Sequence, residues 1–128
     1  QAFDKPVSFS DGVALRVGAI SQSTSDAQGP GEFHGRPQTS IPLTLTNGSK
    51  QAVDLSAVVV TMTYGTPARV AAPVYGDGAI DFSGTVKPGA KATATYLFAV
   101  PAKQLGDVTM SVDFDGQHAA ATFEGSVR

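Results

Sequence analysis

The sequence contains few of the residues on which catalytic and metal sites depend. Its 128 residues include no cysteine, no tryptophan and only two histidines, and charged residues make up 16%. The lack of cysteine excludes a disulfide scaffold, a thiolate metal site, a blue-copper centre and a cysteine nucleophile. Nine lysines and arginines against eleven acidic residues give a net charge of −2, which argues against nucleic acid or an anionic membrane as a partner. No uncharged apolar run is long enough to span a membrane.

What the chain does contain is strand-forming sequence separated by turns. Its length fits one domain, which we expect to comprise residues 1–128. Apolar and polar residues alternate in stretches such as 41–45 and 108–114, as in strands that bury one face. Asp11-Gly12 and Asp115-Gly116 are strong hairpin signals. The sequence therefore predicts an all-β protein, an antiparallel β-sandwich of about 7–9 strands, with a closed barrel as the alternative.

Three local patterns carry more specific predictions. Pro42 has no backbone N–H to donate, so its strand should begin there or lie at a sheet edge. Residues 57–60 form a continuous apolar run, which fits a central strand covered on both faces. Asn47-Gly48-Ser49 matches the N-glycosylation sequon but also reads as a tight Asn-Gly turn, and we favour the turn.

Two stretches resemble a family of bacterial extracellular domains. Residues 35–55 combine an alternating apolar strand, a turn centred on Asn47 and a Val-x-Leu, and residues 86–101 combine a Pro-Gly turn with Phe98-x-Val-Pro. Both are similar to immunoglobulin-like domains of an uncharacterised family, found in secreted and lipid-anchored proteins of Gram-positive bacteria. The resemblance implies an immunoglobulin-like fold and an extracellular or cell-surface location. It implies no catalytic residue.

The first residue and the composition agree with this location. A chain that begins with Gln1 rather than Met fits a protein trimmed after a signal or lipoprotein leader. We therefore expect an exported protein that is secreted, or lipid-anchored in its full-length precursor.

The candidate binding residues lie in two loop regions. Residues 21–38 lose all periodicity, and a loop of this length in a compact domain is often functional. This loop carries Phe33, His34 and Arg36, and Tyr75 is the one tyrosine in a loop context. We expect these four side chains to contact another protein or a cell-envelope component at the ends of the sandwich. In the competing interpretation, Phe33 and Tyr75 are buried in the core.

A metal site is the alternative function. Asp77 and Asp81 flank a glycine turn and are weak candidates for calcium ligands. Copper(I) could use thioether and imidazole ligands, although both methionines fall in alternating strands and are better explained as core residues. The four residues for such a site are Met62, Met110, His34 and His118. We otherwise expect no cofactor.

The sequence offers little for enzymatic chemistry. It has no Gly-x-Ser-x-Gly elbow, and no nucleophile and base are specified as a pair. The prediction is therefore a non-enzymatic interaction or accessory module. A metal- or small-ligand-binding extracellular protein is the second hypothesis, and a small hydrolase is the third.

Replacing Phe33 and Tyr75 by alanine distinguishes the binding interpretation from the core interpretation. If the two rings serve a partner, the melting temperature measured by calorimetry should stay nearly unchanged. A loss of roughly 3–5 kcal/mol, typical of truncated core aromatics, would show instead that they are buried.

Overall fold

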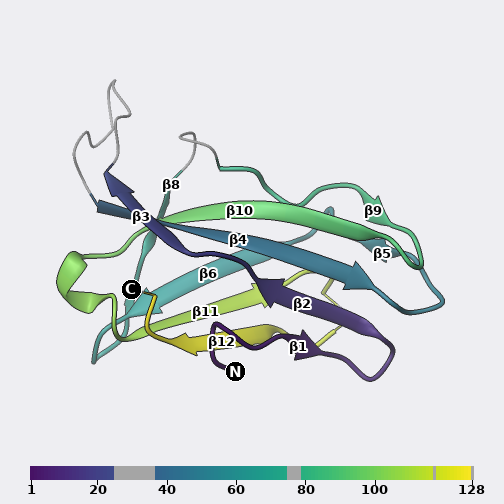
Figure 1. Cartoon of the computed structure of the whole chain (residues 1–128), viewed down its shortest axis with the longest axis horizontal. Coiled ribbons are helices and arrows are strands. Elements are labelled where there is room, and N and C mark those ends of the chain that lie inside the picture. The colour runs from purple at the N-terminus through teal and green to yellow at the C-terminus, as the bar shows by residue number, and fades with distance from the viewer. Residues whose placement is uncertain (25–36, 75–78, 117, 128) are drawn as a thin grey trace.

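The computed structural model describes residues 1–24, 37–74, 79–116 and 118–127. In this part, the chain forms twelve antiparallel strands and one 3-10 turn, joined by connecting segments. They form a six-stranded sheet, a four-stranded sheet and a two-stranded pair. Figure 1 shows the two larger sheets as two layers. No pairing between described strands joins these two sheets. The predicted antiparallel β-sandwich is therefore confirmed, with twelve described strands instead of about 7–9, and the barrel alternative is wrong. The predicted loop at residues 21–38 is too long at both ends, because Ser21–Thr24 and Pro37–Asn47 are strands.

The six-stranded sheet is built around two long neighbouring strands, β4 and β10. They pair over eight residues, from Lys91 opposite Thr46 to Phe98 opposite Thr39. The order is β1-β2-β4-β10-β8, and β3 also pairs with β4. The strands are β1 (Val7–Ser8), β2 (Val13–Val17), β3 (Ser21–Thr24), β4 (Pro37–Asn47), β8 (Ala72–Val74) and β10 (Lys91–Ala99).

The four-stranded sheet forms the second layer, in the order β12-β11-β6-β7. Its strands are β6 (Val59–Tyr64), β7 (Arg69–Val70), β11 (Val108–Asp113) and β12 (Ala121–Gly125). The remaining pair joins β5 (Val53–Asp54) to β9 (Thr85–Val86), and the 3-10 turn η1 (Ala102–Gln104) leads from β10 toward β11. Of the described residues, none belongs to a helix long and apolar enough to cross a membrane.

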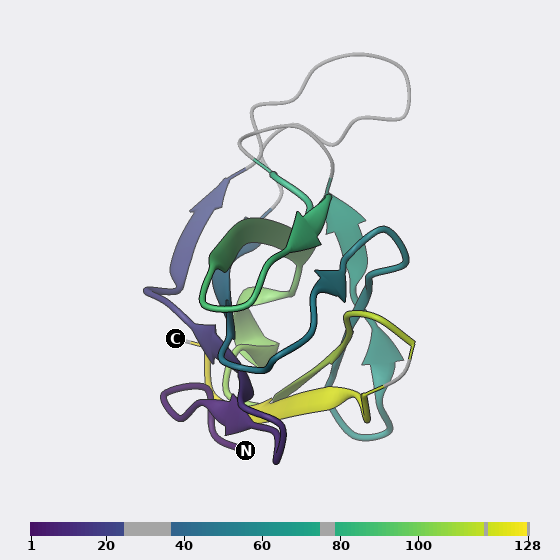
Figure 2. The ribbon, with the colours of Figure 1, turned by 90° about the vertical axis from the view of Figure 1, so that its right-hand side faces the viewer.

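The core lies between the two layers and takes the inward residue of each alternating pair. Ile41, Leu43 and Leu45 of β4 are buried on one side, and Met62 and Met110 face each other across β6 and β11 on the other. Burying one large apolar side chain stabilises the fold by roughly 1.5–3 kcal/mol. Figure 2 views the layers from the end that carries β5 and β9 and shows β12 beside the N-terminal segment. There the backbone of Gln1 bonds to Thr122 and Glu124 of β12.

Pro42 does not lie where its chemistry predicted. It sits in the middle of β4, which is flanked by β2 and β10, so the expectation of a strand start or an edge is wrong. The Pro42 carbonyl accepts a hydrogen bond from Gly18, at the gap between β2 and β3. The N–H and C=O of one strand residue point to the same side. The N–H that Pro42 lacks would therefore also point into this gap, where no strand pairs with it. The proline therefore removes no hydrogen bond from the ladder.

The apolar run at residues 57–60 is not a strand covered on both faces. Ala57 and Val58 precede β6, and Val59 is 56% exposed. β7 pairs with β6 only at Thr63 and Tyr64, so the first half of β6 has a described neighbour on one side only, which is β11. The continuous run reflects this sheet edge, and the prediction of a central strand was wrong.

Asn47, the only asparagine of the chain, ends β4 and is completely buried. Its side-chain amide donates to the carbonyl oxygens of Gln51 and Val86 at 2.8 and 2.9 Å. Its Oδ1 accepts from the backbone N–H and the hydroxyl of Ser49. The side chain thus fixes the turn after β4 against the segment that leads into β10, as the turn interpretation of the sequon predicted.

Two glycines allow the turns at this end to approach each other. The Gly48 N–H donates to the Gly12 carbonyl at 3.0 Å, and a Cβ on either glycine would lie 2.6 Å from a carbonyl oxygen of the other. The β1–β2 hairpin is therefore held against the end of β4 by a backbone contact that a larger residue would prevent.

Replacing Asn47 by alanine should destabilise the protein by roughly 1–3 kcal/mol, because the Val86 carbonyl loses its donor in a buried hydrogen bond and the Gln51 carbonyl loses one of its two donors. Chemical denaturation measures the loss. The control is Gln51→Ala, whose side chain is exposed and whose removal should change the free energy of unfolding by less than about 0.5 kcal/mol. Equal stability of the two variants would contradict the role given to Asn47.

Candidate functional site

Most of the binding and metal residues predicted from the sequence cannot be placed. Phe33, His34, Arg36, Tyr75 and Asp77 lie outside the described residues. These predictions therefore remain predictions, and the candidate site is built from the described part of the chain.

Asp81 is described, and its carboxylate lies at an exposed position beside a shallow groove of about 340 Å³. This groove lies between the first half of β6 and the β8 side of the larger sheet, and Tyr96 forms part of its wall. The Tyr96 hydroxyl accepts a hydrogen bond from the Phe82 N–H at 3.1 Å. Burial raises the pKa of Tyr96, and the charge of Asp81 adds to this effect. Tyr96 therefore stays protonated at neutral pH and has a structural role.

The methionines proposed as copper ligands are core residues. Met62 and Met110 are both fully buried and lie opposite each other in the β6–β11 pair. Within the described ranges, no group of three or more His, Asp or Glu side chains could hold a metal ion. This part of the structure therefore gives no support to the metal hypothesis.

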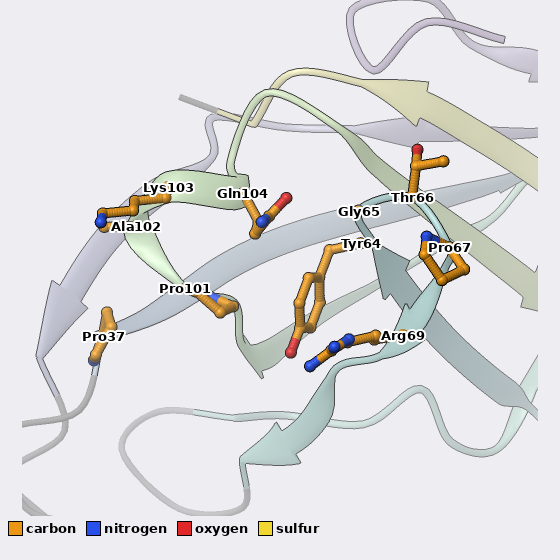
Figure 3. Close-up of a pocket in the computed structure, with 10 residues that line it drawn as sticks. All are labelled: Pro37, Tyr64, Gly65, Thr66, Pro67, Arg69, Pro101, Ala102, Lys103 and Gln104. Atoms are coloured by element: carbon orange, nitrogen blue, oxygen red, sulfur yellow. The ribbon is translucent and has the colours of Figure 1, made fainter.

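A larger groove lies at the end of the sandwich where β6 finishes and η1 begins. Its volume is about 630 Å³, within the usual range of ligand pockets, roughly 300–1,000 Å³. Three separate segments line it, as Figure 3 shows: the start of β4, the β6–β7 connection and the segment of η1. We call it the end groove; its residues are Pro37, Tyr64, Gly65, Thr66, Pro67, Arg69, Pro101, Ala102, Lys103 and Gln104.

The pairing of β6 with β7 positions the two largest side chains of the end groove. Tyr64 lies directly opposite Arg69, and opposite residues of an antiparallel pair project from the same face of the sheet. In Figure 3 the Tyr64 hydroxyl points toward the Arg69 guanidinium, with Pro101 on the opposite wall. Tyr64 is half-buried and also packs against the core. Its ring is therefore a fixed part of the groove.

Hydrogen bonds hold the two walls of the end groove together. The Gly65 N–H donates to the Asp107 carbonyl at 3.1 Å, and the Thr66 hydroxyl donates to the Asp107 carboxylate at 3.3 Å. On the other wall the Gln104 N–H donates to Pro101, and the Asp107 N–H donates to Gln104. These bonds connect both walls through Asp107. The groove is thus formed before any ligand arrives, which reduces the ordering cost of binding.

A second cluster of functional groups lies at the opposite end of the sandwich, where His118 is held between two aspartates. Its Nδ1 is 2.6 Å from Asp115 Oδ2, and its Nε2 is 2.6 Å from Asp11 Oδ2. The rings of Phe9 and Phe114 lie 5.0 Å from the imidazole. Asp11 belongs to the β1–β2 turn and Asp115 to the β11–β12 turn, so this histidine cluster links the two sheets.

The charges of the histidine cluster stabilise one another. Burial disfavours the imidazolium, but hydrogen bonds to Asp11 and Asp115, together with their negative charges, raise the pKa of His118 above its ordinary 6.5. The backbone N–H of Val13 and the His118 side chain lower the pKa of Asp11 below 3.8. With both ring nitrogens bonded to carboxylates, His118 has none left to act as a base toward a hydroxyl nucleophile. We therefore assign the cluster a structural role.

Neither the histidine cluster nor the end groove could be predicted from the sequence, and the reason is the same for both. Only 20% of the His118 side chain is exposed, because Asp11 reaches it from a turn 107 residues away in the sequence. The end groove collects residues from positions 37, 64–69 and 101–104. No local pattern marks either set. Only the Asp115-Gly116 turn signal could have suggested that Asp115 is fixed in place.

Comparisons with known proteins support the fold only. No protein-family model and no curated protein sequence matches the chain. Among solved structures, the chain is similar to an uncharacterised β-sandwich protein from Clostridium difficile 630, with a TM-score of 0.52 and 13% sequence identity. The match covers 94% of this chain and 89% of that protein. At this identity the similarity shows the β-sandwich architecture and carries no information on activity.

The histidine cluster should make stability depend on pH. Because the pKa of His118 is raised by folding, its stabilising contribution is complete below about pH 6.5 and is lost as the pH rises through the folded-state value. The contribution of Asp11, whose pKa is lowered, is complete above about pH 3.8 and is lost as the pH falls through its folded-state value. Between pH 6 and 9 the melting temperature should fall by about 3 °C more in the wild type than in His118→Gln.

Differential scanning calorimetry at several pH values measures this difference. His34→Gln is the control, because it removes the other histidine of the chain and leaves all members of the cluster in place. Parallel pH profiles of the wild type and His118→Gln would contradict the charge stabilisation.

Proposed function

We propose that this chain is an exported, non-enzymatic module with an immunoglobulin-like fold, and that it binds another protein or a cell-envelope component through the end groove. The observation that carries this proposal is the groove itself. It has the volume of a ligand site, a fixed aromatic side chain and hydrogen-bonded walls. Loops on a rigid sandwich are a common place for binding residues.

The arrangement of reactive groups supports a binding role rather than catalysis. Both ring nitrogens of His118 are hydrogen-bonded to carboxylates, and the chain has no cysteine. The aliphatic hydroxyl of the end groove is that of Thr66, and it donates a hydrogen bond to the Asp107 carboxylate. His118, the one histidine in the described ranges, does not line the groove. A nucleophile activated by a positioned base is therefore missing from the described walls.

The proposed location rests on the sequence. The resemblance of residues 35–55 and 86–101 to secreted and lipid-anchored immunoglobulin-like domains supports export. The absence of cysteine and the low charge are compatible with it. The calcium and copper alternatives remain predictions for the loops that contain His34 and Asp77.

Filling the end groove should abolish binding without affecting the fold. Ala102 lies exposed on η1 and lines the groove, so Ala102→Trp places an indole in the space a ligand would occupy. Two probes test the proposal: a phage library of random 12-residue peptides selected on the immobilised protein, and co-sedimentation with purified peptidoglycan. At least one probe should bind the wild type, and binding to Ala102→Trp should fall by about tenfold or more.

The control is Ala120→Trp, which adds the same ring at an exposed position that does not line the groove. It should bind like the wild type. Failure of both probes to bind the wild type would contradict the proposed function. Binding that is equal in all three proteins would show that the end groove is not the site.

A further inference from the structure

The end groove combines positive charge with an apolar lining. Among the described residues, Arg69 and Lys103 are the only charged ones that line it, and none of the described carboxylates does. This local excess of positive charge contrasts with the net charge of −2 for the whole chain. The other lining residues include three prolines, an alanine and a glycine. A ligand that matches this lining carries a negative charge beside apolar groups.

We propose that the end groove binds an acidic peptide segment, with a carboxylate held by Arg69 and a neighbouring apolar side chain placed against Tyr64 and the prolines. This inference rests on the proposed function and specifies its partner. It assigns the main anion contact to Arg69, because a guanidinium can bind both oxygens of a carboxylate with two parallel hydrogen bonds. Lys103 lines the other wall, and its side chain points away from Arg69 in Figure 3, so it adds to the positive charge of the groove without contacting the same carboxylate.

The two cations are available for such a contact. Neither Arg69 nor Lys103 forms an ion pair with a described carboxylate. Asp107, which connects the two walls, uses its carboxylate to accept the Thr66 hydroxyl hydrogen bond and does not line the groove. Both cationic side chains are exposed, so a ligand carboxylate would reach them without displacing an existing described partner. Charge complementarity would also steer an acidic segment toward this end of the molecule.

The three prolines of the lining favour apolar peptide side chains over a sugar ring. Pro37, Pro67 and Pro101 offer no side-chain donors or acceptors and no backbone N–H. A sugar ring placed against them would bury hydroxyl groups without partners, which costs binding free energy. Apolar side chains of a peptide lose nothing on such a surface. Tyr64 supplies a rigid aromatic contact of the kind that is frequent at peptide and protein interfaces.

The test compares two blocked hexapeptides that differ in one group. The first carries a glutamate between two leucines, and the second carries glutamine at the same position. Titration of the ¹⁵N-labelled protein, followed by NMR, should shift the backbone amides of Gly65, Thr66 and Gln104. The glutamate peptide should bind at least about fivefold more tightly than the glutamine peptide, and this preference should weaken as salt is added.

Matched variants assign the preference to Arg69. Arg69→Gln should bind both peptides about equally, whereas Arg16→Gln, on β2 and outside the groove, should keep the wild-type preference. Equal binding of the two peptides by the wild type, or no binding of either, would overturn the proposal. So would an oligogalacturonate that shifts the same amides at lower concentration than the glutamate peptide.

These outcomes are distinct from a failure of the proposed function. If the peptide library or peptidoglycan binds the end groove but the glutamate preference is absent, the module remains a binding protein and only the acidic-peptide assignment is wrong. If no probe binds the wild type, both proposals are wrong.

Discussion

The structure depends on burying the inward-facing side chains of two stacked sheets. The apolar positions of β2, β4 and β10 on one side meet those of β6, β11 and β12 on the other, and they form one continuous cluster. Because this packing uses nearly every large apolar side chain of the described strands, Val59, Val70 and Ile80 are the only large hydrophobic residues in the described part of the chain that are exposed. The surfaces left for recognition are therefore at the ends and edges of the sandwich, where connections between the sheets meet.

The two ends of the sandwich differ in how their turns are held together. At one end, the histidine cluster joins turns of the two larger sheets, and Asn47 and the Gly12–Gly48 contact fix the end of β4 to the neighbouring turns. At the other end no such closure is described, and the end groove remains between the β6–β7 connection and η1. The charge-linked end stabilises the sandwich, and the other end carries the groove to which the proposed function assigns binding.

The fold was predictable because alternation and turn chemistry are local. Ile41, Leu43 and Leu45 alternate as a strand must when one face is buried, and the Asp11-Gly12 and Asp115-Gly116 turns mark hairpins that the structure contains. The predictions for Pro42 and residues 57–60 were wrong because the position of a strand in its sheet depends on which strands pair with it. Pro42 removes no hydrogen bond because it lies opposite the gap between β2 and β3. Residues 59–60 lie at a sheet edge because β7 is short and pairs only with the end of β6.

The candidate site was much less predictable than the fold. Tyr64, Arg69 and Lys103 have no shared motif, and only the pairing of β6 with β7 and the position of η1 bring them to one groove. Likewise Asp11 and His118 are joined by the closure of the sandwich rather than by spacing. The binding residues expected from the sequence, Phe33, His34, Arg36 and Tyr75, remain predictions, because they lie outside the described residues.

The proposed function places ligand binding at the open end of the sandwich and nowhere else. Hydrogen–deuterium exchange, measured with and without the tightest-binding peptide or polymer, shows which residues the ligand covers. Exchange should slow on binding in residues 64–69 and 101–104 and stay unchanged in β4, β10 and β11. Slower exchange around His118 and the β1–β2 turn, or a change spread evenly over the core strands, would contradict it.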